Sequence, residues 1–119
     1  MSDVQLTKDS AKLIAVIYKL YLDKRKNEKA KSDAVFFAGS SYFHEKYFTD
    51  WQLDDIDETF RELSRAGLIK CEYGDNMVSQ FFITDEGIIY MENRFKDGMK
   101  SVMAFIMEHT PNILSLLIP

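Results

Sequence analysis

Cysteine, proline and glycine are all scarce in this chain of 119 residues, which contains one, two and five of them respectively. The single cysteine, Cys71, excludes an intramolecular disulfide and a cysteine metal cluster, and its place in an apolar stretch predicts a small buried side chain. Because 46% of the residues are hydrophobic and glycine and proline are few, the composition is that of a folded protein. The length fits one domain with a sizeable core.

Positive charge is also in short supply. The chain has 15 Lys and Arg against 19 Asp and Glu, a formal net charge of -4, which argues against non-specific affinity for nucleic acid or anionic membranes. No apolar run approaches the roughly 20 residues that span a bilayer. Residues 1–4 lack the basic and apolar segments of a secretion signal. We therefore expect a cytoplasmic protein with no membrane span.

Residues with catalytic or metal-binding potential are few. His44 and His109 are the two histidines, and neither has a second ligand at a metal-binding spacing. The sequence contains no glycine-rich phosphate loop and no nucleophile elbow, and its carboxylates fall on helix faces that we predict to be solvated. We expect no enzyme activity, no metal, no cofactor and no small-molecule substrate.

Apolar periodicity predicts a helix at each end of the chain. The first begins near Thr7, a capping residue, and its apolar side chains recur at helical spacing from Leu13 to Tyr21. The last begins at Thr84 and continues to Pro111, with apolar residues three or four positions apart, as in a coiled-coil seam. The seam consists of Ile88, Met91, Phe95, Met99, Val102 and Ile106.

That seam, together with the apolar tail Ile113–Ile118, exceeds what one small domain needs to cover its own core. We predict a homodimer in which the seam forms the contact and the tail is buried. The alternative is that the first helix packs across the seam within one chain.

The region before Thr49 is aromatic. Residues 34–38 and 42–48 are predicted as two short helical pieces, because Gly39-Ser40-Ser41 between them combines a breaker with capping residues. Aromatic side chains can stack on nucleic-acid bases, but single-strand binders combine them with a basic groove. In this acidic chain we assign most of them to the core: Phe36, Phe37, Tyr42, Phe43 and Tyr47.

The central stretch predicts a helix followed by a hairpin. The helix runs from about Trp51 to Ala66, with Thr49 or Asp50 as its cap, and it ends at Gly67, where a left-handed residue is needed. Two strands follow, covering residues 68–73 and ending at residue 83, with the three-residue connection Gly74-Asp75-Asn76 between them.

This order of elements resembles a winged helix-turn-helix domain, and in particular regulators of the PadR and MarR kind. The residues that carry the resemblance are Leu53–Ile69, similar to a recognition helix entering a wing strand, and Phe82–Gly87, similar to the return strand and the start of the last helix. The fold it implies is α+β and mostly helical, with a two- or three-stranded antiparallel wing and a long C-terminal helix. Residues 1–84 would form the winged-helix core, and residues 85–119 the dimerisation element of the same domain.

The resemblance also implies DNA binding, with the helix that carries Leu53 in the major groove. The charge of that helix opposes this, because six acids face two arginines between Asp50 and Ala66, whereas phosphate contacts require cations. Two readings stay open, and the first is preferred because most winged-helix domains of this size serve regulation. The chain is a DNA-binding transcriptional regulator, or it is a protein-interaction module whose acidic helix binds a basic partner or mimics DNA. The residues expected to contact DNA or a partner are Gln52, Asp55, Arg61, Arg65, Lys24, Arg25, Lys26 and Lys46.

Overall fold

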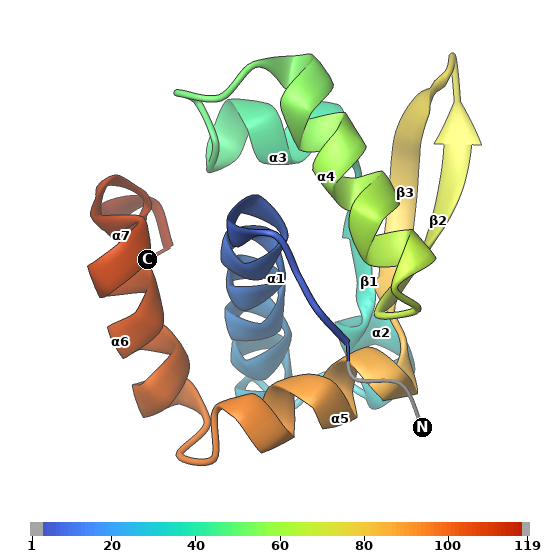
Figure 1. Cartoon of the computed structure of the whole chain (residues 1–119). Coiled ribbons are helices and arrows are strands. Elements are labelled where there is room, and N and C mark those ends of the chain that lie inside the picture. The colour runs from blue at the N-terminus through green and yellow to red at the C-terminus, as the bar shows by residue number, and fades with distance from the viewer. Residues whose placement is uncertain (1–3, 118–119) are drawn as a thin grey trace.

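The computed structural model describes residues 4–117, which form seven helices and one three-stranded antiparallel sheet. In chain order the elements are α1 (Lys8–Lys26), α2 (Lys31–Ala34), β1 (Phe36–Ala38), α3 (Ser40–Lys46), α4 (Leu53–Arg65), β2 (Ile69–Gly74), β3 (Met77–Ile83), α5 (Asp85–Arg94), α6 (Met99–His109) and α7 (Pro111–Leu117). The predicted class, α+β and mostly helical, is confirmed at that level. Figure 1 shows α1 in the middle, between α6 on one side and α4 with the sheet on the other.

Helix α1 is the centre of the hydrophobic core. Its predicted cap is confirmed, because the hydroxyl of Thr7 accepts a hydrogen bond from the backbone N–H of Ser10 at 3.1 Å. Every residue from Leu13 to Lys19 is buried. A helix that is apolar around most of its circumference needs neighbours on several sides, and here α4 and α6 both pack against it.

Strand β1 corrects the prediction of a helical piece over residues 34–38. It pairs antiparallel with β3, which places Phe37 opposite Phe81, with their rings stacked 5.3 Å apart. Aromatic residues suit a strand once a partner strand is present, and that partner lies far along the sequence. At Gly39 a Cβ atom would lie 2.0 Å from the carbonyl oxygen of Val78, so only glycine permits this approach.

The start of α4 also differs from the prediction. Gln52 occupies the N-cap position without a side-chain hydrogen bond, so the assignment of the cap to Thr49 or Asp50 is wrong. The cause is a turn just before the helix, in which the backbone N–H of Trp51 bonds to the carbonyl of Phe48 at 3.1 Å. The rings of these two residues pack edge to face 4.8 Å apart, and the helix begins only after this contact.

The hairpin of β2 and β3 follows the predicted order. Gly67 has φ of 81°, which confirms the left-handed residue expected after α4. The turn is shorter than predicted, since Gly74 already pairs with Met77. Asp75 and Asn76 form the connection alone, with φ of 53° and 66°, as a two-residue turn with two left-handed residues requires.

The predicted long C-terminal helix is wrong, because three helices, α5, α6 and α7, occupy that part of the chain. Gly98, with φ of 62°, precedes α6 and turns the chain between α5 and α6. Figure 1 shows α5 crossing beneath the core and α6 rising beside α1. The helix has already ended at Arg94, with Phe95 at φ of -119° and ψ of 75°, and a turn in which the N–H of Gly98 bonds to the carbonyl of Phe95 at 2.8 Å leads into α6. The spacing of the apolar residues gives no sign of this interruption.

The residues assigned to a dimer seam are therefore part of this chain's own core. Ile88, Met91, Phe95, Val102 and Ile106 are between 0% and 7% exposed, and Met99 is partly buried against the same core. Helix α1 packs against α6, which is the alternative arrangement that the sequence left open. Their role as a dimer contact is thereby corrected, whereas the oligomeric state itself stays a prediction.

The apolar tail also folds back onto its own chain. It forms α7, in which Ile113 is 2% and Leu117 5% exposed, while Ile118 lies outside the described residues. The ammonium group of Lys19 donates hydrogen bonds to the carboxylate of Asp23 and, at 2.7 Å, to the carbonyl oxygen of Leu117. A buried lysine thus satisfies a carbonyl at the C-terminal end of α7, where cations are favoured.

No helix within residues 4–117 combines the length and the apolar character that crossing a membrane requires.

Candidate interaction surfaces

The outer face of α4 is acidic, as the sequence predicts. Asp54, Asp55 and Glu58 are exposed, and so is Gln52 at the N-cap position. The apolar stripe on the opposite face is buried against α1 and the sheet. The amphipathic division of the helix therefore turns a row of carboxylates toward solvent.

Asp57 differs from the other α4 acids because its carboxylate points into the protein. One oxygen, Oδ1, accepts from the Ser40 hydroxyl at 2.6 Å and from the backbone N–H of Val78 at 2.9 Å. The other, Oδ2, accepts from Nε of Arg61 at 2.9 Å. A single side chain thus joins α4 to the first residue of α3 and to β3, and we call Asp57, Ser40, Arg61 and the Val78 amide the Asp57 hub.

The pKa of the Asp57 carboxyl reflects these contacts. Burial by itself would raise that pKa, but the hydrogen bonds from Ser40, the Val78 amide and Arg61 together outweigh burial and hold the pKa below its ordinary value. The fold therefore stabilises the charged form of the Asp57 carboxyl group, and the role of Asp57 is structural.

The two arginines of α4 also make contacts within the chain. Besides Asp57, Arg61 donates from Nη2 to the carbonyl oxygen of Asn76 in the hairpin turn at 2.8 Å, and its guanidinium carbon lies 4.8 Å from the ring centroid of Tyr73. Arg65 donates from Nη2 to Glu58 at 2.8 Å. Arg61 braces the hairpin against α4, and Arg65 is paired with a neighbouring acid, so neither extends alone toward a partner.

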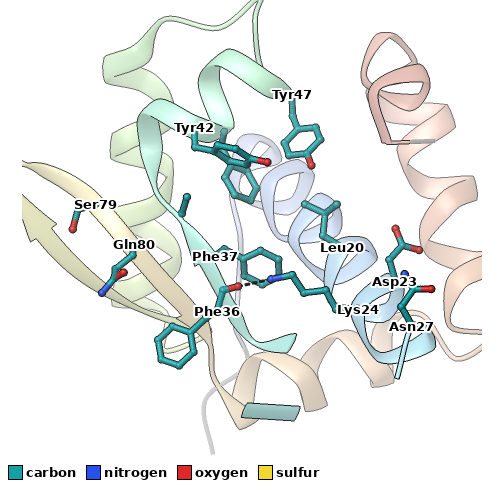
Figure 2. A pocket seen from close by; sticks show the side chains of 12 residues that line it. Leu20, Asp23, Lys24, Asn27, Phe36, Phe37, Tyr42, Tyr47, Ser79 and Gln80 are labelled. Atoms are coloured by element: carbon teal, nitrogen blue, oxygen red, sulfur yellow. Dashed lines mark hydrogen bonds between the residues drawn. The ribbon is translucent and has the colours of Figure 1, made fainter. Parts of the chain in front are cut away.

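The predicted basic residues lie around the C-terminal end of α1. Lys24 donates from Nζ to the carbonyl oxygen of Phe36 at 2.5 Å and lies 3.9 Å from the ring centroid of Phe37, as Figure 2 shows. Burial, with a smaller contribution from the charge of Lys29, lowers the pKa of the Lys24 amine. Lys46 of α3 donates to the hydroxyl of Tyr42 at 2.9 Å.

The other two residues of the predicted basic set, Arg25 and Lys26, are exposed. Arg25 reaches the carbonyl oxygen of Lys29 at 3.4 Å, a long hydrogen bond. Arg25 and Lys26 follow Lys24 in the last turn of α1, where cations suit the helix dipole.

Two adjoining pockets form a groove at this end of α1. The first, of about 570 Å³, lies between α1, β1, β3 and α3 and is shown in Figure 2. The second, of about 550 Å³, lies between α1, α3 and α7. Asp23, Asn27 and Tyr47 line both pockets. We call the two together the α1-end groove; its other principal residues are Leu20, Lys24, Phe37, Tyr42, Lys26, Lys46 and Leu116.

The residues predicted to contact DNA or a partner therefore separate into two groups. Lys24, Lys26 and Lys46 line the α1-end groove. Within residues 4–117, the lining of that groove includes no residue of α4. The DNA-binding reading needs both groups to approach one duplex, whereas the structure gives an acidic helix face and a distinct basic groove.

The histidines and the cysteine do not converge on a site. His44 donates from Nε2 to the carbonyl oxygen of Trp51 at 2.9 Å in the tautomer that this contact favours. Cys71 is half-buried, and burial raises the pKa of its thiol, which makes the thiolate nucleophile scarcer. In the described part of the chain no three His, Cys, Asp or Glu residues are grouped so that they could hold a metal ion.

Sequence reasoning missed the aromatic and apolar wall of the α1-end groove. Tyr42 is 44% and Leu116 45% exposed, whereas the sequence predicts a core position for most of the aromatic cluster and burial in a dimer for the tail. For Phe43 and Tyr47 the assignment to the core is confirmed, since both are buried. Tyr42 and Lys46 are four residues apart on α3, and this spacing indicates that they are in contact. The facing wall of the groove has no such local signal, because it comes from α1, β1 and α7.

Comparison with known proteins adds no relative: no family model, no curated protein and no solved structure matches this chain.

Proposed function

We propose that this chain is a non-enzymatic regulatory protein with a winged helix-turn-helix fold. The order of α1, β1, α3, α4, β2 and β3 supports the proposal, as does the sheet order β1-β3-β2, in which the hairpin returns beside the first strand. In this assignment α4 takes the place of the recognition helix and the hairpin takes that of the wing. The proposed location is the cytoplasm.

Of the two modes of action, we propose that α4 binds a basic protein partner. The observation that carries this proposal is the use of charge on α4: Arg61 and Arg65 are both paired with acids of the same helix, while Asp54 and Asp55 are exposed. Phosphates approaching this face would meet carboxylates without compensating cations. A Lys- or Arg-rich surface would find complementary charge there.

The test compares two probes of opposite charge at low salt. A Lys- and Arg-rich peptide and a mixed-sequence DNA duplex, each fluorescently labelled, are titrated with the full chain, and anisotropy is measured. We expect the peptide to bind in the micromolar range and the duplex to show no binding there. Replacing Asp54→Lys and Glu58→Lys together should weaken peptide binding about tenfold or more, because attraction becomes repulsion.

The matched control makes the same charge change on α5 and after it, with Glu92→Lys and Asp97→Lys, which are both exposed. Equal losses in the two variants would show general charge attraction and contradict a site on α4. Binding of the duplex with a steep salt dependence that substitution of Lys24, Arg25 and Lys26 flattens would favour the DNA-binding regulator instead.

A further inference from the structure

A second surface, the α1-end groove, has the opposite character to α4. Its cations are Lys24, Lys26 and Lys46, and its single acid, Asp23, is hydrogen-bonded to the buried ammonium of Lys19. The groove is therefore positive in a chain whose net charge is -4.

The walls of the groove are apolar and aromatic. Figure 2 shows the rings of Phe37, Tyr42 and Tyr47 around Leu20, with the hydroxyl ends of the two tyrosines close together on the same side. Phe36 contributes its carbonyl oxygen to the groove, and not its ring. The ring is turned away from Tyr42, and its centroid lies 5.3 Å from that of the Phe82 ring. Such a surface can receive apolar side chains while the lysines at its rim receive carboxylates.

The edge of β1 lies in the same groove. The carbonyl oxygen of Val35 accepts from the backbone N–H of Ile83 at 3.1 Å, so it points toward β3. Because successive peptide groups of a strand alternate in direction, the carbonyl of Phe36 points away from β3, and it meets Lys24 there. At the β1 edge of the sheet, the Phe36 carbonyl is thus covered by one lysine side chain, and a lysine is a common way to protect an edge strand.

We propose that the α1-end groove binds an extended segment of a partner protein in which apolar side chains alternate with Asp or Glu. One apolar side chain enters the pocket beside Phe37 and Tyr42, and a second enters the pocket beside Leu116. An acidic side chain of the segment forms an ion pair with Lys24, which replaces the hydrogen bond from Lys24 to the carbonyl of Phe36. The β1 edge can then pair with the backbone of the segment. The two pockets are joined at Tyr47 and Asn27, so one segment can reach both.

The concave shape favours a protein segment over the two other anionic classes. A bilayer surface cannot follow two pockets, and a nucleic-acid strand requires a longer cationic path than three lysines interrupted by Asp23. The proposal does not depend on what α4 binds, because the two surfaces share no residue.

The test uses a short labelled peptide in which Leu and Glu alternate, and the same peptide with Gln in place of Glu. Anisotropy titrations with the full chain should show that the Leu/Glu peptide binds about tenfold or more tightly than the Leu/Gln peptide. Amide chemical shifts in NMR spectra should change at Phe37, Ala38 and Leu116 and leave Asp54 and Glu58 unchanged.

Lys46→Glu should weaken binding of the Leu/Glu peptide about tenfold, while Lys100→Glu, the same charge change on α6, should leave it unaltered. Tyr42→Ser provides a second variant that retains the charge and should weaken both peptides. Circular dichroism checks that each variant is folded.

Four results would overturn the proposal: equal affinity for the two peptides, equal losses in Lys46→Glu and Lys100→Glu, shift changes confined to α4, or no binding by the folded wild-type chain at millimolar peptide. Displacement of the Leu/Glu peptide by vesicles of anionic lipid or by single-stranded oligothymidylate, with the same shift changes, would overturn the choice of a protein segment.

Discussion

Asp57 on α4 and the lysines of the α1-end groove are both charged, but their charges have different roles. At α4 the decisive carboxylate, that of Asp57, is 12% exposed and joins three elements of the fold. In the groove the charges of Lys26 and Lys46 are exposed, and Lys24 bonds to a single carbonyl. Charges that satisfy buried hydrogen-bonding groups determine stability. Charges beside an open apolar surface are free to determine which partner binds.

The largest effect should follow from breaking the Asp57 hub. Asp57→Ala removes the acceptor of the Val78 amide, the Ser40 hydroxyl and Arg61 together, and leaves them buried or half-buried without that partner. We expect the free energy of unfolding to fall by about 3–5 kcal/mol, measured by urea denaturation followed by circular dichroism. Asp54→Ala, on the exposed face of the same helix, should change it by less than about 0.5 kcal/mol. Similar losses in the two variants would contradict the structural role of Asp57.

A smaller effect should appear as a dependence of stability on pH. Because the pKa of folded Asp57 is lowered, its charged form stabilises the protein above the pKa of the unfolded chain, about 3.9. This contribution is lost as the pH falls through the lower pKa of the folded state. The free energy of unfolding of the wild-type chain should therefore decline below about pH 4 more steeply than that of Asp57→Asn. Parallel curves for the two proteins would remove Asp57 as the cause.

The sequence contained enough to predict the elements that depend on local signals. The caps at Thr7 and Thr84 and the left-handed residue Gly67 were predictable, because capping hydroxyls and glycine act over a few residues. The buried stripe of α4 was predictable from its spacing. These local signals account for α1, α4, the start of α5 and the hairpin.

What the sequence could not show depends on contacts between distant residues. β1 forms because it pairs with β3, which places Phe37 opposite Phe81. The sequence alone does not indicate this strand, since a run of aromatic residues is compatible with either a helix or a strand. The break between Arg94 and Met99 was hidden because the apolar spacing continues across it. The acidity of α4 was visible, but the inward direction of Asp57 depends on Ser40 and Val78, whose nearness to Asp57 arises only in the fold.

The smallest effect on stability should come from a substitution in the α1-end groove. It is also the sharpest test of the difference between Asp57 on α4 and the lysines of the groove. Lys24→Met keeps the aliphatic stem over Phe37 but removes the hydrogen bond to the Phe36 carbonyl and the attraction between the ammonium and the ring. An exposed interaction of each kind contributes about 0.5–1 kcal/mol, and the Phe36 carbonyl lies at the opening of a groove where water can replace the amine. We therefore expect the free energy of unfolding to fall by less than about 1.5 kcal/mol, measured by urea denaturation beside Asp57→Ala. A loss as large as that of Asp57→Ala would mean that Lys24 holds β1 in place, and the distinction between a structural charge on α4 and a binding charge in the groove would no longer stand.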